Sequence, residues 1–187
     1  MAASHDGVST GFDWVYDARL HVGATAWFVF AERGYNPYWN INTSEHIPPL
    51  ISVFDTGAPI NPYPSISGTH NGTITPNKII EVSKLYTYPC AGTGGHTKYA
   101  RIYNDSWSIE TLPWEGYGGD WHNLSFTEPF KLYANVEYKF TIITGSYPQI
   151  HHRKTLPTEN GWINCTEFVD ANGNKYNDRT PAIMLWP

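Results

Sequence analysis

The chain has 187 residues, which is enough for one hydrophobic core together with an extension. Charged residues make up only 16% of the sequence, aromatic residues another 16%, and the formal net charge is -5. These values exclude a nucleic-acid partner, because phosphate contacts need clustered Lys and Arg. No apolar run is long enough to span a membrane, and the N-terminal MAASHDG lacks the features of a signal peptide.

The first quarter of the chain predicts one strand followed by a long loop. Apolar residues alternate with other residues between Phe12 and Phe30, which is the two-residue period of a strand. Turn formers fill residues 32–49, so this stretch predicts an exposed loop that carries Tyr38 and Trp39. We expect residues 1–48 to form a strand-and-loop extension that packs on a main domain.

The main domain, residues 49–187, is predicted to contain short strands separated by turns. A loop is expected over residues 60–77, where Gly, Asn, Thr and Pro are frequent. The clearest hairpin is predicted at residues 124–145, with its turn at Ala134 and Asn135. Strands are expected near residues 49–57, 78–88, 98–103, 106–111, 162–169 and 181–186.

No stretch shows the helical period, and Asn172-Gly173 is the strongest short hairpin signal in the chain. Strands of this length, spaced by turns about every ten residues, are typical of an antiparallel sandwich. The predicted fold class is therefore an all-β, jelly-roll-like β-sandwich.

About seven tenths of the chain carries five segments in a marked order: ISVFDTGAPINPYPSISGTHNGTI, KLYTYPCAGTGGHTKYARIYN, GDWHNLSFTEPFKLYANVEY, TGSYPQIHH and GWINCTEFVDANG. Together they resemble a module that recurs in extracellular and cell-surface proteins of archaea, notably methanogens and their relatives. The resemblance implies a location at the cell surface and attachment to larger proteins, and it supplies no catalytic residues. The spacing F-x-x-P-F-x-L-x-A-N-x-x-Y is also similar to surface β-sandwich modules that bind sugars.

Secretion is also indicated by N-glycosylation sequons and by the cysteines. Asn-x-Ser/Thr sequons mark exposed loops in secreted proteins, and five are present where chance predicts one or two. The only cysteines, Cys90 and Cys165, are expected to form a disulfide in an oxidising compartment, although two buried free thiols are the alternative. The sequons are at Asn42, Asn71, Asn104, Asn123 and Asn164.

Aromatic residues point to a glycan as ligand. Sugar rings stack their C–H faces on Trp and Tyr, while carboxylates and amides hold the hydroxyl groups. Trp107, Trp114, Tyr117 and Trp121 lie in one Gly-rich stretch together with Asp120. Tyr38 and Trp39 could form a second surface. The alternative is that these tryptophans belong to the core.

Histidines give a competing hypothesis of a metal centre. Neutral imidazole is a common ligand for zinc and copper, and ligands from four strand ends could converge at one rim of a sandwich. Asp120 could bind the same metal or orient a ligand. The alternative is that each imidazole binds a loop backbone. The four candidates are His70, His96, His122 and His151.

Four further kinds of chemistry have less support in the sequence. The segment from Asp170 to Asp178 alternates oxygen ligands like a calcium loop, but its glycine is misplaced and the final glutamate is missing. Processing after Ser4 would leave His5 at the N-terminus, as in a copper brace. No G-x-S-x-G motif is present, so the sequence does not support a serine nucleophile of the α/β-hydrolase kind. Carboxylates for a glycosidase pair are available at Glu110, Glu115, Asp120, Glu128 and Glu159.

These observations favour an extracellular, non-catalytic binding or assembly module of an archaeal surface protein, with a glycan or neighbouring surface subunits as partner. One alternative is a metal-binding protein or metal-dependent enzyme. Another is a structural subunit of a surface layer or filament, joined through edge strands such as Leu20–Phe30.

Overall fold

The computed structural model of the chain describes residues 2–4, 8–9, 52–61 and 65–187. The chain divides into two units, Met1–Leu50 and Ile51–Pro187. The first contributes the two short paired strands β1 (Ala2–Ser4) and β2 (Val8–Ser9). The predicted strand within residues 12–30 and the loop residues Tyr38 and Trp39 lie outside the described residues.

The second unit is built from antiparallel strands, and the described residues contain no helix. Its strands are β3 (Phe54–Asp55), β4 (Gly68–Pro76), β5 (Ile80–Thr87), β6 (Thr97–Tyr103), β7 (Ser108–Glu110), β8 (Asn123–Leu132), β9 (Tyr138–Thr144), β10 (Ile150–His151), β11 (Thr155–Thr158), β12 (Gly161–Asp170), β13 (Lys175–Tyr176), β14 (Thr180–Pro181) and β15 (Ile183–Trp186).

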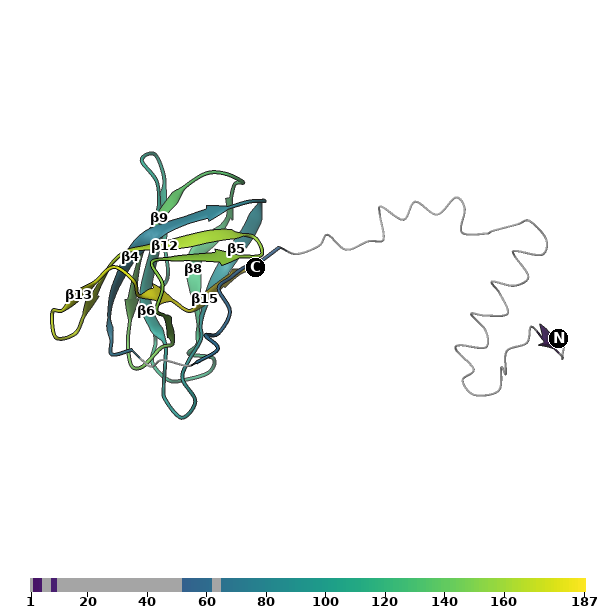
Figure 1. The fold of residues 1–187 in the computed structure, drawn as a ribbon, viewed down its shortest axis with the longest axis horizontal. Helices are drawn as coiled ribbons and strands as arrows, with labels where there is room; N and C mark the ends of the chain where they lie inside the picture. Colours follow the sequence, from purple (N-terminus) through teal and green to yellow (C-terminus); the bar gives the residue numbers. More distant parts are fainter. Residues whose placement is uncertain (1, 5–7, 10–51, 62–64) are drawn as a thin grey trace. The chain divides into compact units, whose positions relative to one another are not determined.

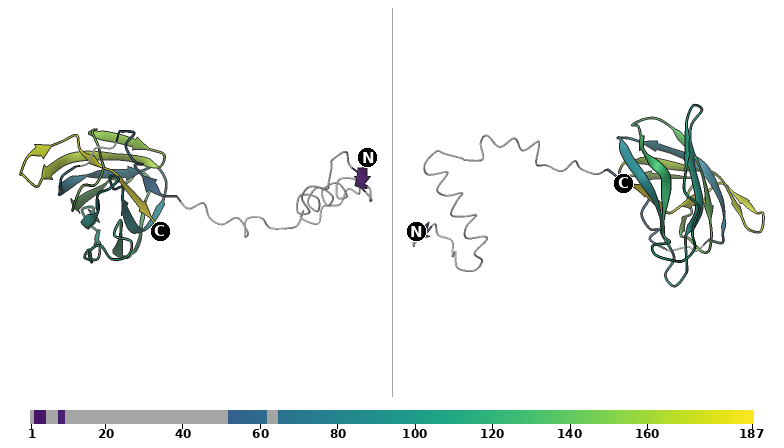
Figure 2. Two further views of the ribbon diagram at one scale, coloured as in Figure 1. Left: turned by 90° about the horizontal axis from the view of Figure 1, so that it is seen from below. Right: turned by 180° about the vertical axis from the view of Figure 1, so that it is seen from behind.

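Two sheets form the layers of the second unit (Figures 1 and 2). One has seven strands in the order β11-β12-β4-β9-β6-β7, with β13 paired to the end of β12. The other has four strands in the order β3-β15-β5-β8. A short β10-β14 pair lies outside both sheets. The predicted antiparallel β-sandwich is therefore confirmed.

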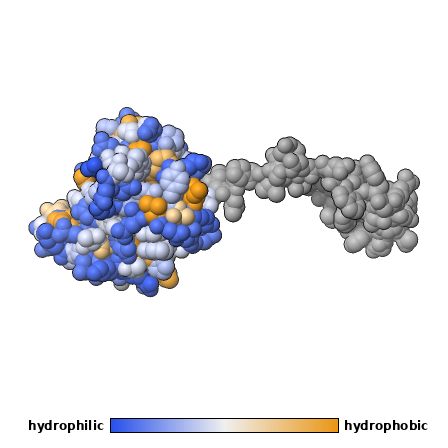
Figure 3. All heavy atoms as spheres, turned by 90° about the horizontal axis from the view of Figure 1, so that it is seen from above, coloured by the Kyte–Doolittle hydropathy of each residue, from blue (hydrophilic) through white to orange (hydrophobic). Residues whose placement is uncertain are grey.

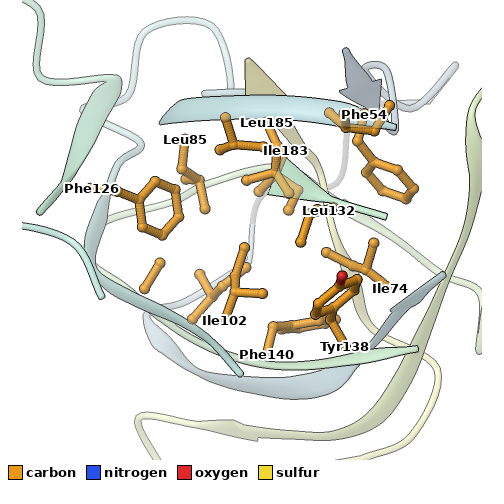
Figure 4. Packing of buried hydrophobic residues seen from close by; sticks show 14 of the residues in the cluster. Phe54, Ile74, Leu85, Ile102, Phe126, Leu132, Tyr138, Phe140, Ile183 and Leu185 are labelled. Atoms are coloured by element: carbon orange, nitrogen blue, oxygen red, sulfur yellow. The ribbon is translucent and has the colours of Figure 1, made fainter. Parts of the chain in front are cut away.

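The core lies between these two sheets (Figure 4). Ile74 of β4, Ile102 of β6 and Phe140 of β9 point from the larger sheet toward Leu85 of β5 and Leu185 of β15 in the smaller sheet, and all five side chains are at most 1% exposed. Alternation along each strand puts one face into this core and the other toward solvent.

The predicted hairpin at residues 124–145 is wrong in its pairing. β8 pairs with β5 in the four-stranded sheet, whereas β9 pairs with β4 and β6 in the seven-stranded sheet. The connection through Asn135, whose φ is 60°, carries the chain from one layer to the other. A short turn between two amphipathic strands has the same sequence pattern in both arrangements, so the pattern alone could not separate them.

The loop predicted over residues 60–77 was also wrong, since β4 occupies most of it and pairs with both β12 and β9. Gly72 is required at the centre of this strand because a Cβ there would collide with the Asn164 carbonyl and the Phe140 ring. The glycines that suggested a loop instead allow close packing inside a sheet.

The hairpin predicted at Asn172-Gly173 is confirmed. β12 and β13 pair there, and Gly173 has a φ of 84°, which favours glycine. A jelly roll has eight strands in two Greek keys, whereas these sheets hold seven and four, so that finer assignment stays a prediction. Within the described residues, no helix is long and apolar enough to cross a membrane.

Candidate ligand-binding site

The connection between β7 and β8, residues 111–122, forms one wall of a cavity of about 200 Å³. Gly116 and Gly119 have φ values of 98° and 65°, so the connection turns sharply at positions that favour glycine. The start of β8 also contributes to the lining. The lining residues are Leu112, Pro113, Trp114, Glu115, Gly116, Gly118, Asp120, Trp121, Asn123, Leu124 and Ser125.

Two of the lining residues, Trp114 and Trp121, belong to an aromatic cluster, which we define as His96, Trp114, Tyr117, Trp121 and His122. The His96 ring stacks on Trp114 with centroids 3.8 Å apart and planes 10° apart. Tyr117 meets Trp114 edge-on at 5.0 Å and Trp121 at 5.9 Å. Trp121 contacts His122 at 4.8 Å. Such contacts give a rigid wall, because each ring restricts its neighbours.

Three loops are joined through this cluster. The Tyr117 hydroxyl lies 2.9 Å from Ser146 Oγ, in the loop after β9. A Cβ at Gly94 would lie 2.7 Å from the Tyr117 ring, and one at Gly145 would overlap the His96 imidazole. The absence of a side chain at Gly94 and at Gly145 therefore allows these loops to approach closely. The contribution of Ser146 was missed, because one serine in a loop gives no signal in the sequence.

The tautomer of His96 follows from its hydrogen bond. Nδ1 lies 2.7 Å from the Gly94 carbonyl oxygen, which can only accept, so Nδ1 carries the hydrogen. Nε2 is buried with no hydrogen-bond partner in the described protein. Burial lowers the pKa of His96, and the hydrogen bond to Gly94 opposes this only in part. His96 therefore supports the Trp114 indole by ring stacking.

Polar groups line the cavity beside these rings. Asn123 donates from Nδ2 to Asp120, and its Oδ1 accepts from Trp186 Nε1 at 3.0 Å. These two bonds fix the Asn123 amide and one carboxylate oxygen of Asp120. Among the described residues, the indole N–H groups of Trp114 and Trp121 are buried without an acceptor. Buried indole donors usually have a partner, so these two N–H groups are candidates for a hydrogen bond to a ligand oxygen.

Of the residues predicted to bind a ligand, Trp114, Tyr117, Asp120 and Trp121 are brought together. Trp107 is not, and its assignment to the site was wrong. It contacts Phe130 at 5.3 Å and Tyr138 at 6.1 Å, and it packs against the core. Tyr38 and Trp39 lie outside the described residues.

The structure does not bring the four predicted metal-binding histidines together. His70 is fully buried, stacks on Phe168 at 4.1 Å and donates from Nδ1 to the Arg179 carbonyl at 3.0 Å. His151 bonds the Gly57 carbonyl through Nε2 at 3.0 Å. His122 lies 3.8 Å from Asp120.

Within residues 52–61 and 65–187, no three His, Cys, Asp or Glu side chains are placed to share a metal ion. A zinc or copper centre shared by three or more of His70, His96, His122 and His151 is thus not supported within these residues. The backbone hydrogen bonds of His70, His96 and His151 explain these residues instead.

The calcium hypothesis also fails at the turn after β12. The Asp170 carboxylate accepts bonds from the backbone N–H groups of Asn172 and Asn174, both at 2.9 Å, and from Asn174 Nδ2 at 3.0 Å. Donors therefore surround the oxygens that a cation would need. This pattern caps a hairpin turn.

Both cysteines are buried and free, so the expected disulfide is not formed. Cys90 follows β5, and its carbonyl accepts from Thr93. Cys165 lies within β12, opposite Gly72 of β4. The two thiols thus belong to different parts of the sandwich, and burial raises the pKa of each.

The described sequons differ in their environments. Asn71 accepts from Thr141 and Asn164 donates to Thr73, both from strand positions in the larger sheet. Asn123 lines the cavity, and Asn104 lies in the turn between β6 and β7, where it accepts from Ser106. Asn104 is thus the described sequon placed in a turn, while Asn42 lies outside the described residues.

No protein-family model, curated protein or solved structure matches this chain. The geometry of the cavity is therefore the basis for assigning a function.

Proposed function

We propose that residues 52–187 form a non-catalytic glycan-binding module of an extracellular or cell-surface protein, and that the cavity beside the 111–122 connection holds one sugar ring. The observation that carries the proposal is the combination, in one cavity, of two tryptophans with side chains able to bind hydroxyl groups.

The volume supports a single ring. Pockets for drug-sized ligands start at about 300 Å³, and this cavity measures about 200 Å³. His96 covers one face of the Trp114 indole, so the opposite face is the one left for a ligand. The C–H face of a pyranose can stack on such an indole face.

Hydroxyl groups would be held by Asp120, Glu115, Asn123 and Ser125, which share the lining with the indoles. Asn123 is already fixed by Asp120 and Trp186, so little side-chain entropy is lost when a ligand binds. Figure 3 shows apolar residues scattered in small spots among hydrophilic ones, as is usual for a protein surface.

Assembly through edge strands has less support. The described edges are short, with two residues in β3 and three in β7, and β11 contains Pro157. The edge strand β8 contains Pro129 and is bridged to the chain after β7 at Thr111. Short edges and prolines hinder strand addition, so ligand binding rather than polymerisation is the proposed activity.

The location outside the cell rests on the likeness to archaeal surface modules and, among the described sequons, on the turn position of Asn104. The disulfide no longer supports it, because the two thiols are free. An archaeal cell surface, with attachment to a larger protein, remains part of the proposal.

A glycan array tests the function. We expect binding to at least one glycan family, with a loss of tenfold or more in affinity for Trp114→Ala and for Trp121→Ala, because each change removes a stacking face. Trp162→Ala is the matched control, since Trp162 is 40% exposed on β12 and does not line the cavity. Equal affinity in all three variants, or no binding by the wild type, would contradict the proposal.

A further inference from the structure

The charge of the cavity has a single sign. Its lining includes the carboxylates Glu115 and Asp120 and the uncharged polar residues Asn123 and Ser125, but no Lys, Arg or His. The Asp120 side chain is 65% exposed, and one of its oxygens is engaged by Asn123. The other oxygen, Oδ1, lies 3.8 Å from His122 Nδ1 on this largely exposed side chain.

Neighbouring cations do not offset this charge from within the lining. Lys84 pairs across strands with Ser125, but its ammonium group lies over the Trp186 ring at 4.9 Å. Lys98 is close enough to affect His96, which lies behind Trp114. His122 is 3.8 Å from Asp120 and also lies outside the lining.

We propose that this cavity selects its ligand by charge. It accepts a pyranose without a carboxylate or sulfate group, prefers a ring that carries a free amine, and rejects the corresponding uronic acid. Glu115 and Asp120 are the residues that discriminate. The inference rests on the proposed function, since it concerns the ligand of the same cavity.

The physical reason is that like charges brought together in a partly enclosed site repel, whereas an ammonium group is attracted there. A hydroxyl group, in contrast, can donate to a carboxylate without any change in charge. Specificity of this kind comes from a repulsive element as much as from the attractive ones.

The test uses methyl glycosides of glucose and of galactose, each as the parent sugar, the 2-amino sugar and the 6-carboxylate. Binding is followed through the indole N–H signals in NMR spectra at about pH 6, where the 2-amino group is an ammonium ion and the 6-carboxylate is ionised. At 20 mM salt we expect the 6-carboxylate to bind at least tenfold more weakly than its parent, and the 2-amino sugar to bind at least as tightly. The difference between parent and carboxylate should shrink at 500 mM salt, because ions screen exposed charges.

Variants identify the discriminating residues. Glu115→Gln combined with Asp120→Asn keeps the shape and one acceptor oxygen at each position, and it should reduce the difference to less than about threefold. Lys84→Gln is the matched control, because it removes a nearby charge that does not line the cavity, and it should leave the difference in place. If the double variant fails to fold, the salt dependence of the wild type decides.

The outcomes separate the two proposals. Parent sugar and carboxylate binding equally well at low salt would overturn the charge selection and leave the glycan-binding function in place. A tenfold difference that persists in the folded double variant would also overturn it. A protein that binds neither parent sugar, nor any glycan on the array, would overturn both.

Discussion

His96 and His70 lie in two regions with nearly the same local chemistry. Each imidazole donates from Nδ1 to a backbone carbonyl, has a buried Nε2 without a partner among the described residues, and stacks on an aromatic ring. The partner of His70 is Phe168, which is buried in β12, whereas the partner of His96 is Trp114, which lines the cavity. A histidine that stacks on an aromatic ring in this way contributes to packing in both regions. It supports the cavity only where the ring that it contacts lines the cavity, as Trp114 does.

The largest effects are expected from the glycine that packs against each pair. A Cβ at Gly68 would overlap the Val169 carbonyl and the Phe168 ring, and a Cβ at Gly145 would overlap the His96 ring. Gly68→Ala should lower the free energy of unfolding by about 3 kcal/mol, the upper range for overpacking, since the backbone of β12 must move. Gly145→Ala should lower it by about 2 kcal/mol, and it should also weaken glycan binding at least tenfold.

Urea unfolding and array binding, measured on both variants, check this pair. Gly57→Ala is a control for the substitution itself in open space, although its φ of 67° adds strain. If the folded Gly68 and Gly145 variants lost glycan affinity equally, the conclusion that only the His96 region supports the cavity would be contradicted.

The next largest effect is a dependence of the free energy of unfolding on pH that is caused by His70. Burial lowers the pKa of His70 from 6.5 to about 4, despite the bond to the Arg179 carbonyl. The unfolded chain therefore binds a proton below about pH 6.5 that the folded protein binds only near pH 4. As the pH is lowered from about 6.5 to about 4, the free energy of unfolding should fall by about 3 kcal/mol in total. Below about pH 4, His70 should cause no further change.

Urea unfolding between pH 4.5 and 7.5 measures this slope in the wild type and in His70→Gln. The variant should be less stable at pH 7.5 but should lose less stability on acidification. An unchanged slope in the variant would show that other groups cause the dependence.

The smallest effect is expected from Tyr117→Phe. Tyr117 is 54% exposed, and its hydroxyl bonds Ser146 at the surface, so its loss should change stability by less than about 1 kcal/mol. Because the bond ties the connection that lines the cavity to the loop after β9, glycan affinity should fall by about twofold to threefold. Tyr133→Phe, at a 55% exposed tyrosine outside the lining, should have no effect on binding, and calorimetric titration of both variants checks the comparison.

The sequence predicted those parts of the site that are local in the chain. Trp114, Tyr117, Asp120 and Trp121 lie within eight positions of one another, so one turning connection brings them together. The stacking of His96 on Trp114 and the bond from Tyr117 to Ser146 join loops that are far apart in sequence, and no short pattern encodes such contacts. Trp107 was assigned to the wrong environment because it shares the composition of the site but faces the core.

For the fold, alternation predicted strands and the sandwich class, but it did not predict which strands pair. The β8 and β9 pattern fits a hairpin as well as a crossing between layers, and the choice depends on partners elsewhere in the chain. β4 was missed because Gly72 indicates a loop by local propensity, whereas the contact with Phe140 makes glycine necessary in that strand.

The position of β12 has a consequence for how the chain is made. This strand lies between β11 and β4, and its register joins Ile163 to Ile74, so the larger sheet cannot be completed until most of the polypeptide has left the ribosome. Contacts between such distant parts of a chain form slowly. Until then one side of β4 lacks its neighbour, and during synthesis that unpaired side would be the place for a chaperone to bind.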